Sequence, residues 1–164
     1  MTVAHVIGEI VRHPVRFLRA RWNWKAATLS AIMRGAIFFG ATLNLGLATA
    51  SWTLLVDAAF RIPMAGACAA VVQDVRWAEP RWGGVATAVV VVPVASHAIE
   101  ITAHSIARTP MLWRGVGASI GLSVLSSAIE LFLMRRDVML VGPGSGSVAT
   151  DLKRLYHLTR SRST

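Results

Sequence analysis

Long apolar stretches constrain this chain more than any other feature of its sequence. Four of them stand out, at residues 35–56, 62–73, 83–107 and 115–134. A helix that crosses the hydrocarbon core of a bilayer needs about 20 predominantly apolar residues, within a range of about 17–25. The first, third and fourth stretches meet this requirement, and the second meets it when it is extended to residues 58–75. The pattern predicts an all-α integral membrane protein, an antiparallel bundle of about four transmembrane helices. The alternative for the second stretch is a re-entrant or interfacial segment.

The overall composition favours a lipid environment. Only 15% of the 164 residues are charged, compared with about 25% in typical soluble domains, and the mean hydropathy is +0.55. The formal net charge is +9, which in a soluble protein would suggest binding to nucleic acid. Here the basic residues lie between apolar blocks, as in membrane proteins, so we expect no nucleic-acid partner. The single cysteine, Cys68, excludes an intrachain disulfide framework and a cysteine-rich metal cluster.

The distribution of basic residues predicts the orientation in the membrane. With four spans, 13 of the 17 lysine and arginine residues fall on one side, and the positive-inside rule makes that side cytoplasmic. Both termini are then cytoplasmic, and the expected location is a bacterial inner membrane. The 13 residues are Arg12, Arg16, Arg19, Arg21, Lys25, Arg76, Arg81, Arg135, Arg136, Lys153, Arg154, Arg160 and Arg162. Arg61, Arg108 and Arg114 fall on the opposite side, and Arg34 lies inside the first span. All six tryptophans fall at predicted membrane interfaces, as an aromatic belt does.

The chain divides into three segments. Residues 1–25 form a basic cytoplasmic segment whose apolar residues recur with a helical period, which predicts an amphipathic surface helix that Pro14 interrupts. The transmembrane domain covers residues 26–134. Residues 135–164 form a basic cytoplasmic tail with a glycine-rich linker and a short helix that Ser147 caps. We expect both basic segments to contact anionic lipid at the cytoplasmic face of the bilayer.

Three ionisable residues, His97, Glu100 and His104, lie within about 60° of one another on one face of the third predicted span. Ionisable side chains inside a membrane are costly, so they indicate a function or a specific partner. Glu100 and either histidine could hold a metal ion, with Cys68 of the second span as a further ligand. The two histidines are ~10 Å apart along the helix axis, too far to share one ion. We therefore predict no cofactor; a metal or haem shared with a partner subunit is the alternative.

Small and polar residues on the fourth predicted span indicate how the helices pack. They lie on one face of that helix, in a small-xxx-small pattern that allows close approach. At about 1.5 Å per residue, Ser123 of the fourth span lies level with His97 of the third. We expect the polar faces of these two helices to pack together. The packing residues are Gly115, Ser119, Ser123 and Ser126.

Two opposite charges fall inside the predicted membrane domain near its cytoplasmic side. Glu130 lies in the last third of the fourth span, roughly level with Arg34 of the first span. An ion pair between them would neutralise both charges and connect the two helices. We predict this structural pair; the alternative is that each side chain extends to the nearby interface.

The sequence favours a non-catalytic role. It has no convincingly spaced Ser/His/Asp set and no His-Glu-x-x-His motif, and both exposed ends are too short to fold a catalytic domain. We expect a small non-catalytic integral membrane subunit, or an assembly or scaffold factor, of a larger membrane complex such as an energy-transducing one. Other membrane subunits would be its partners. The alternative is a small transporter or channel in which His97, Glu100 and His104 form a protonatable or metal-binding stripe.

Overall fold

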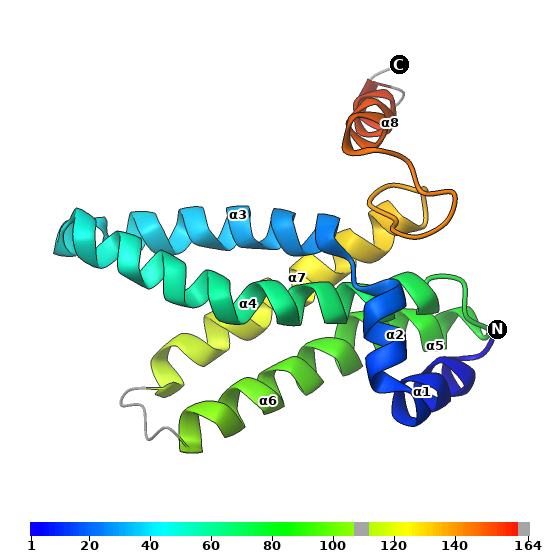
Figure 1. Cartoon of the computed structure of the whole chain (residues 1–164), viewed down its shortest axis with the longest axis horizontal. Helices are drawn as coiled ribbons and strands as arrows, with labels where there is room; N and C mark the ends of the chain where they lie inside the picture. The colour runs from blue at the N-terminus through cyan, green and yellow to red at the C-terminus, as the bar shows by residue number, and fades with distance from the viewer. Residues whose placement is uncertain (107–111, 161–164) are drawn as a thin grey trace.

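A computed structural model describes residues 1–106 and 112–160 of the chain (Figure 1). The molecule is mostly helical, at 82%, and the described residues form no strand, which confirms the all-α prediction. The helical elements, in chain order, are α1 (Val3–Arg12), α2 (Pro14–Arg21), α3 (Trp24–Thr42), the short 3₁₀ turn η1 (Leu43–Leu45), α4 (Leu47–Val75), α5 (Arg81–Ala86), the π-helical turn η2 (Thr87–Val91), α6 (Val92–Ile106), α7 (Leu112–Met134) and α8 (Val148–Arg160).

Two helical hairpins form the body of the molecule (Figure 1). Helices α3 and α4 form the first hairpin; α5, η2 and α6, which follow one another, form the second with α7. The hairpins pack together at one end and diverge toward their turns (Figure 1). The N-terminus, α1, α2 and the segment 135–147 lie at the packed end. We call this the basic end, because most of the arginines of the chain lie there.

The hydrophobic core lies at the basic end, around the last turns of α4. Ala69 and Val75 of α4 are completely buried, and they belong to one cluster with Ala88 of η2 and Met134 of α7. Gly84 allows α5 to approach α4 closely, since a Cβ atom at this position would lie 2.5 Å from the carbonyl oxygen of Val75. The core therefore fixes the two hairpins against each other at this end.

The turn of the first hairpin does not lie where the sequence placed it. The predicted spans 35–56 and 58–75 put the turn near residue 57, whereas α3 ends at Thr42 and α4 is one continuous helix of 29 residues. Gly46 makes the turn, with a φ of +104° and its amide donating to the carbonyl of Leu43 (3.1 Å). A positive φ has little steric cost for glycine alone. The charged residues and the proline near residue 60 lie within this continuous helix.

The third and fourth predicted spans correspond to helices in the structure. Residues 83–106 of the third span fall on α5, η2 and α6, its last residue lies outside the described residues, and residues 115–134 fall on α7. Within the described residues, one helical stretch, Arg81–Ile99, is long and apolar enough to cross a membrane; Ile120–Met134 is apolar but shorter.

The terminal helices begin at residues that the sequence suggests. Thr2 caps α1, its hydroxyl accepting from the amide of His5 (3.3 Å), and a new helix starts at Pro14, where an interruption was predicted. Ser147 caps α8, its hydroxyl accepting from the amide of Thr150 (3.2 Å). Helices α2 and α8 run crosswise to the hairpin helices near the basic end (Figure 1).

Candidate functional site

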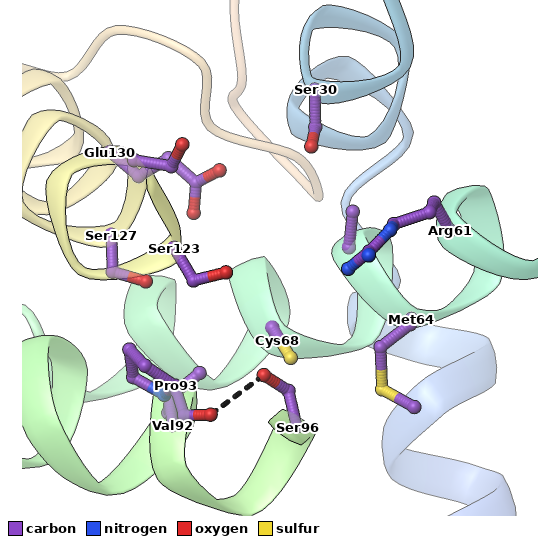
Figure 2. A pocket seen from close by; sticks show the side chains of 12 residues that line it. Ser30, Arg61, Met64, Cys68, Val92, Pro93, Ser96, Ser123, Ser127 and Glu130 are labelled. Carbon is purple, nitrogen blue, oxygen red and sulfur yellow. Dashed lines mark hydrogen bonds between the residues drawn. The ribbon is translucent and has the colours of Figure 1, made fainter. Parts of the chain in front are cut away.

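A polar cavity of about 60 Å³ lies between the two hairpins (Figure 2). All four long helical arms contribute to its wall: α3, α4, α6 and α7. Hydroxyl groups dominate the polar part of the lining, which also includes one carboxylate, one guanidinium and one thiol. These polar lining residues are Ser30, Arg61, Cys68, Ser96, Ser123, Ser126, Ser127 and Glu130.

Helical spacing explains why so many polar groups meet in this cavity. On α7, Ser123, Ser126, Ser127 and Glu130 follow the i, i+3, i+4, i+7 pattern, which places them on one face. On α4, Arg61, Met64, Ala65 and Cys68 follow the same pattern and line the opposite wall. Each helix therefore presents one continuous stripe to the space between the hairpins.

A hydrogen bond joins α6 and α7 beside the cavity. The Nε2 atom of His97 lies 3.0 Å from the hydroxyl oxygen of Ser123, and His97 is only 4% exposed. The structure thus brings together the two residues that the sequence placed at the same depth. The residue before His97, Ser96, donates its hydroxyl to the carbonyl of Pro93 in the preceding turn of the same helix (2.9 Å). The His97–Ser123 bond therefore connects the α6 wall of the cavity to α7.

The chemistry of the cavity suits bound water. A buried water needs about 10–15 Å³ of accessible space and two to four polar partners, and this cavity offers several times that space. Glu130 and Arg61 extend toward the cavity from opposite hairpins (Figure 2). A carboxylate can accept a proton or bind a cation, and serine hydroxyls can both donate and accept hydrogen bonds. The lining can therefore orient water molecules around Glu130.

Some predicted site residues fall outside what the structure describes. The side chains of Arg34, Glu100, His104, Gly115 and Ser119 are among them, so the Arg34–Glu130 pair and the His97–Glu100–His104 stripe stay predictions. In the described part of the chain, no group of three His, Cys, Asp or Glu residues could hold a metal ion.

Arg61 lies deeper in its helix than the sequence predicted. The sequence placed it near the start of the second span, 58–75, on the side opposite the termini, whereas it is the middle residue of α4, 14 residues before Val75. That separation corresponds to ~21 Å along the helix. The stripe of Arg61, Met64, Ala65 and Cys68 lies within the predicted span 58–75, so helical spacing alone could have identified it.

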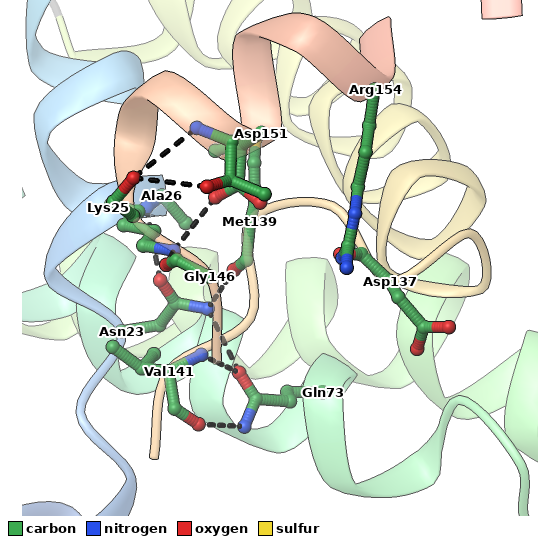
Figure 3. A network of polar contacts seen from close by, with 12 residues as sticks. Asn23, Lys25, Ala26, Gln73, Asp137, Met139, Val141, Gly146, Asp151 and Arg154 are labelled. Atoms are coloured by element: carbon green, nitrogen blue, oxygen red, sulfur yellow. Dashed lines mark hydrogen bonds and ion pairs between the residues drawn. The ribbon is translucent and has the colours of Figure 1, made fainter. Parts of the chain in front are cut away.

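A second polar network, buried at the basic end, was not predicted (Figure 3). Asn23 is fully buried and caps α3, its side-chain oxygen accepting from the amide of Ala26 (3.1 Å). Its side-chain nitrogen donates to Gln73 Oε1 (3.1 Å) and to the carbonyl of Met139 (2.9 Å). Gln73 in turn donates to the carbonyl of Val141 (2.8 Å) and accepts from its amide (3.0 Å). Two buried amide side chains thereby connect α3, α4 and the segment after α7.

A buried ion pair attaches α8 to the start of α3. The Nζ atom of Lys25 lies 2.7 Å from Asp151 Oδ2, and the two side chains are 5% and 6% exposed. Lys25 also donates to the carbonyl of Gly146 (2.5 Å), while Arg154 donates to the carbonyl of Asp137. The sequence grouped Lys25 with the basic residues that face the cytoplasm; the structure instead buries it as an anchor for α8.

Other charges at the basic end are also paired. Arg21 lies 3.4 Å from Asp74. Burial lowers the pKa of the Arg76 guanidinium, while the neighbouring carboxylates of Asp137 and Asp74 raise it. An arginine stays charged at any physiological pH, so Arg76 contributes a fixed positive charge next to the polar network.

Comparison with known proteins gives no family assignment. No family model matches the chain, and no curated protein and no solved structure was found to be significantly similar to it.

Proposed function

We propose that this chain is an integral membrane protein whose spans are α3, α4, the continuous arm α5–η2–α6, and α7. The distribution of side chains supports this proposal, because polar residues face inward and large apolar residues face outward. His97 is 4% exposed, whereas Ile99, on the opposite face of the same helix, is 52% exposed. A soluble protein rarely exposes large contiguous apolar patches. Further exposed apolar residues on the hairpins include Ile32, Trp52, Leu55 and Leu125.

The basic end supports an orientation with both termini in the cytoplasm. The helices that run crosswise to the hairpins gather there (Figure 1), and a helix in this direction would lie in the plane of the membrane interface. Trp24, Trp77 and Trp82 lie at the same end and are exposed, as expected for an interfacial aromatic belt. The positive-inside rule assigns this end to the cytoplasm.

The proposed role is that of a small non-catalytic subunit or assembly factor of a larger membrane complex. The observation that carries it is the divergence of the two hairpins away from the basic end (Figure 1), with a polar cavity between them. Lipid tails cannot satisfy polar groups, so a polar lining within a membrane needs protein or water as its neighbour. A transmembrane segment of a partner, placed between the hairpins, would supply that cover.

The proposed topology predicts that the turn of the first hairpin and the linker before α8 lie on opposite sides of the membrane. Single cysteines would replace Asn44 and Ser145, both of them exposed, in a Cys68→Ala background. We expect a membrane-impermeant thiol reagent to label Asn44→Cys from outside intact cells, and Ser145→Cys only after the membrane is opened. Labelling of both positions from the same side would contradict the topology.

The polar cavity favours one alternative function, a small transporter or channel. In that case Glu130, with the serines and the adjacent His97–Ser123 pair, would form the protonatable site. Copurification in mild detergent followed by native mass spectrometry would separate the two functions. We expect partner subunits at fixed stoichiometry, and no ion flux from liposomes that contain the chain alone. A homo-oligomer whose flux is lost in Glu130→Gln but kept in Glu79→Gln, an exposed acid outside the cavity, would instead establish the transporter.

A further inference from the structure

An apolar groove of about 390 Å³ runs along the outside of the second hairpin at the basic end. Val85 of α5 and Val89 of η2 form one wall, and Ala128 and Phe132 of α7 form the other. Gly84 and Ala88, on the opposite face of the α5–η2 arm, are buried against α4 and the core. The groove thus lies on the face of this arm that is turned away from α4.

Two arginines line this groove where α7 ends. Arg135 and Arg136 directly follow α7 and line the groove together with the apolar residues. The guanidinium carbon of Arg136 lies 3.9 Å from the centre of the Phe132 ring, and that of Arg135 lies 5.9 Å from Trp77. Stacking uses the face of a guanidinium and leaves its N–H edges available. Arg135 donates its Nε to the carbonyl of Arg76 (2.9 Å).

The arrangement matches the chemistry of an anionic phospholipid. Guanidinium groups bind phosphate in a bidentate manner, and basic pockets between transmembrane helices on the cytoplasmic side bind anionic head groups. Glu130, Asp137 and Glu79 are the nearest acids in sequence to the lining residues, and none of them lines the groove. The groove extends from Arg136 back to Ala128, about two turns or ~12 Å of helix, so it can take the upper part of an acyl chain.

The exposed tryptophans place the head-group end at the level of a membrane interface. Trp77 lies beneath Arg135 and is 52% exposed; Trp82 opens α5 and is 74% exposed. Tryptophan prefers the level of the lipid head groups. An acyl chain that enters the groove from there would follow the direction of the neighbouring lipid tails.

We propose that this groove binds one anionic phospholipid of the cytoplasmic leaflet, with its phosphate between Arg135 and Arg136 and one acyl chain along Val85, Val89 and Ala128. The proposal rests on the membrane location proposed above. It assigns to the end of α7 a specific lipid contact, in addition to the general attraction of a basic surface to anionic lipid.

The test compares lipid retention by the purified full chain in detergent. The protein is incubated with phosphatidylglycerol and phosphatidylcholine of equal chain length, and native mass spectrometry measures the bound ratio. We expect one retained phosphatidylglycerol, with a preference that falls by about 10- to 30-fold in the double variant Arg135→Gln/Arg136→Gln, as the loss of two juxtamembrane arginines predicts. The matched control Arg16→Gln/Arg19→Gln removes two exposed arginines of α2 and should keep the preference.

A second variant tests the contribution of the apolar groove to lipid binding separately from that of the two arginines. Ala128→Trp fills the groove and retains both arginines, so we expect it to lose the bound lipid as well. If Ala128→Trp keeps the lipid, or if excess inorganic phosphate displaces it, the groove is not a phospholipid site. Equal retention by all variants of a membrane-embedded protein would overturn this inference alone. A chain that stays in solution without detergent would overturn the membrane location itself.

Discussion

Replacing Lys25 by methionine should detach helix α8 from the rest of the molecule. The substitution removes the partner of Asp151, a carboxylate that is buried and whose Oδ1 atom already has no hydrogen-bond partner in the described structure. Breaking a buried pair by removing one partner typically costs about 3–5 kcal/mol. Because α8 is a terminal helix, the molecule can avoid most of this penalty by releasing it. Amide hydrogen exchange across α8 should therefore accelerate strongly, while exchange in α4 and α7 should change little.

The double variant Lys25→Met/Asp151→Leu tests the cause of this release. Trp24, Leu29 and Leu155 line an apolar cavity next to the ion pair, and replacing both charges of a buried pair by apolar side chains is often neutral or stabilising. We expect the double variant to regain protection in α8. Lys153→Met, at an exposed lysine of the same helix, is the matched control and should behave as wild type. Unchanged exchange in Lys25→Met would show that the pair does not hold α8.

Gly66→Ala is expected to destabilise the first hairpin through a clash with Trp22. A Cβ atom at residue 66 would lie 2.2 Å from the Nε1 atom of Trp22. Trp22 cannot move freely, because its Nε1 donates to the carbonyl of Pro63 (3.2 Å) and the next residue, Asn23, donates its amide to the carbonyl of Gly66 (3.1 Å). Overpacking costs about 1–3 kcal/mol and sometimes more, so the unfolding free energy in detergent should fall by at least that amount.

Two further variants test whether the contact with Trp22 causes this loss of stability. Gly121→Ala changes a helical glycine whose added Cβ meets nothing within 4 Å, so it should be neutral or stabilising by up to about 1 kcal/mol. In a Trp22→Ala background the ring is gone, and Gly66→Ala should then have little further effect. Equal losses from Gly66→Ala in both backgrounds would rule out the Trp22 contact as the cause.

Local signals in the sequence predicted the helical elements well, while the placement of the first turn failed. The cap at Ser147 and the interruption at Pro14 depend only on neighbouring residues, and both appear in the structure. The turn at Gly46 lies inside a continuous apolar stretch. In such a stretch no amphipathic period marks where one helix ends and the next begins. The predicted turn followed only from the bounds given to two apolar stretches, 35–56 and 58–75.

The same limit explains which parts of the site could be predicted. The stripe of Ser123, Ser126 and Glu130 follows from spacing on a single helix, and the structure places all three in the cavity. The contribution of Arg61 depends on how α3 and α4 are aligned in the first hairpin. This alignment differs from the prediction, because the turn lies at Gly46 rather than near residue 57. The attachment of Lys25 to Asp151 joins residues 126 positions apart. No pattern in one sequence identifies such a pair.

The position of Arg61 also bears on how the chain would enter a membrane. Arg61 is the midpoint of α4, 14 residues from Leu47 and 14 from Val75. An arginine at the centre of a candidate span opposes insertion by about 2.5–3.5 kcal/mol. On the proposed topology, α4 alone would therefore insert into the membrane poorly. We expect α4 to be inserted together with α3, as a preformed hairpin. Correct insertion of α4 would then depend on α3, which is synthesised before it.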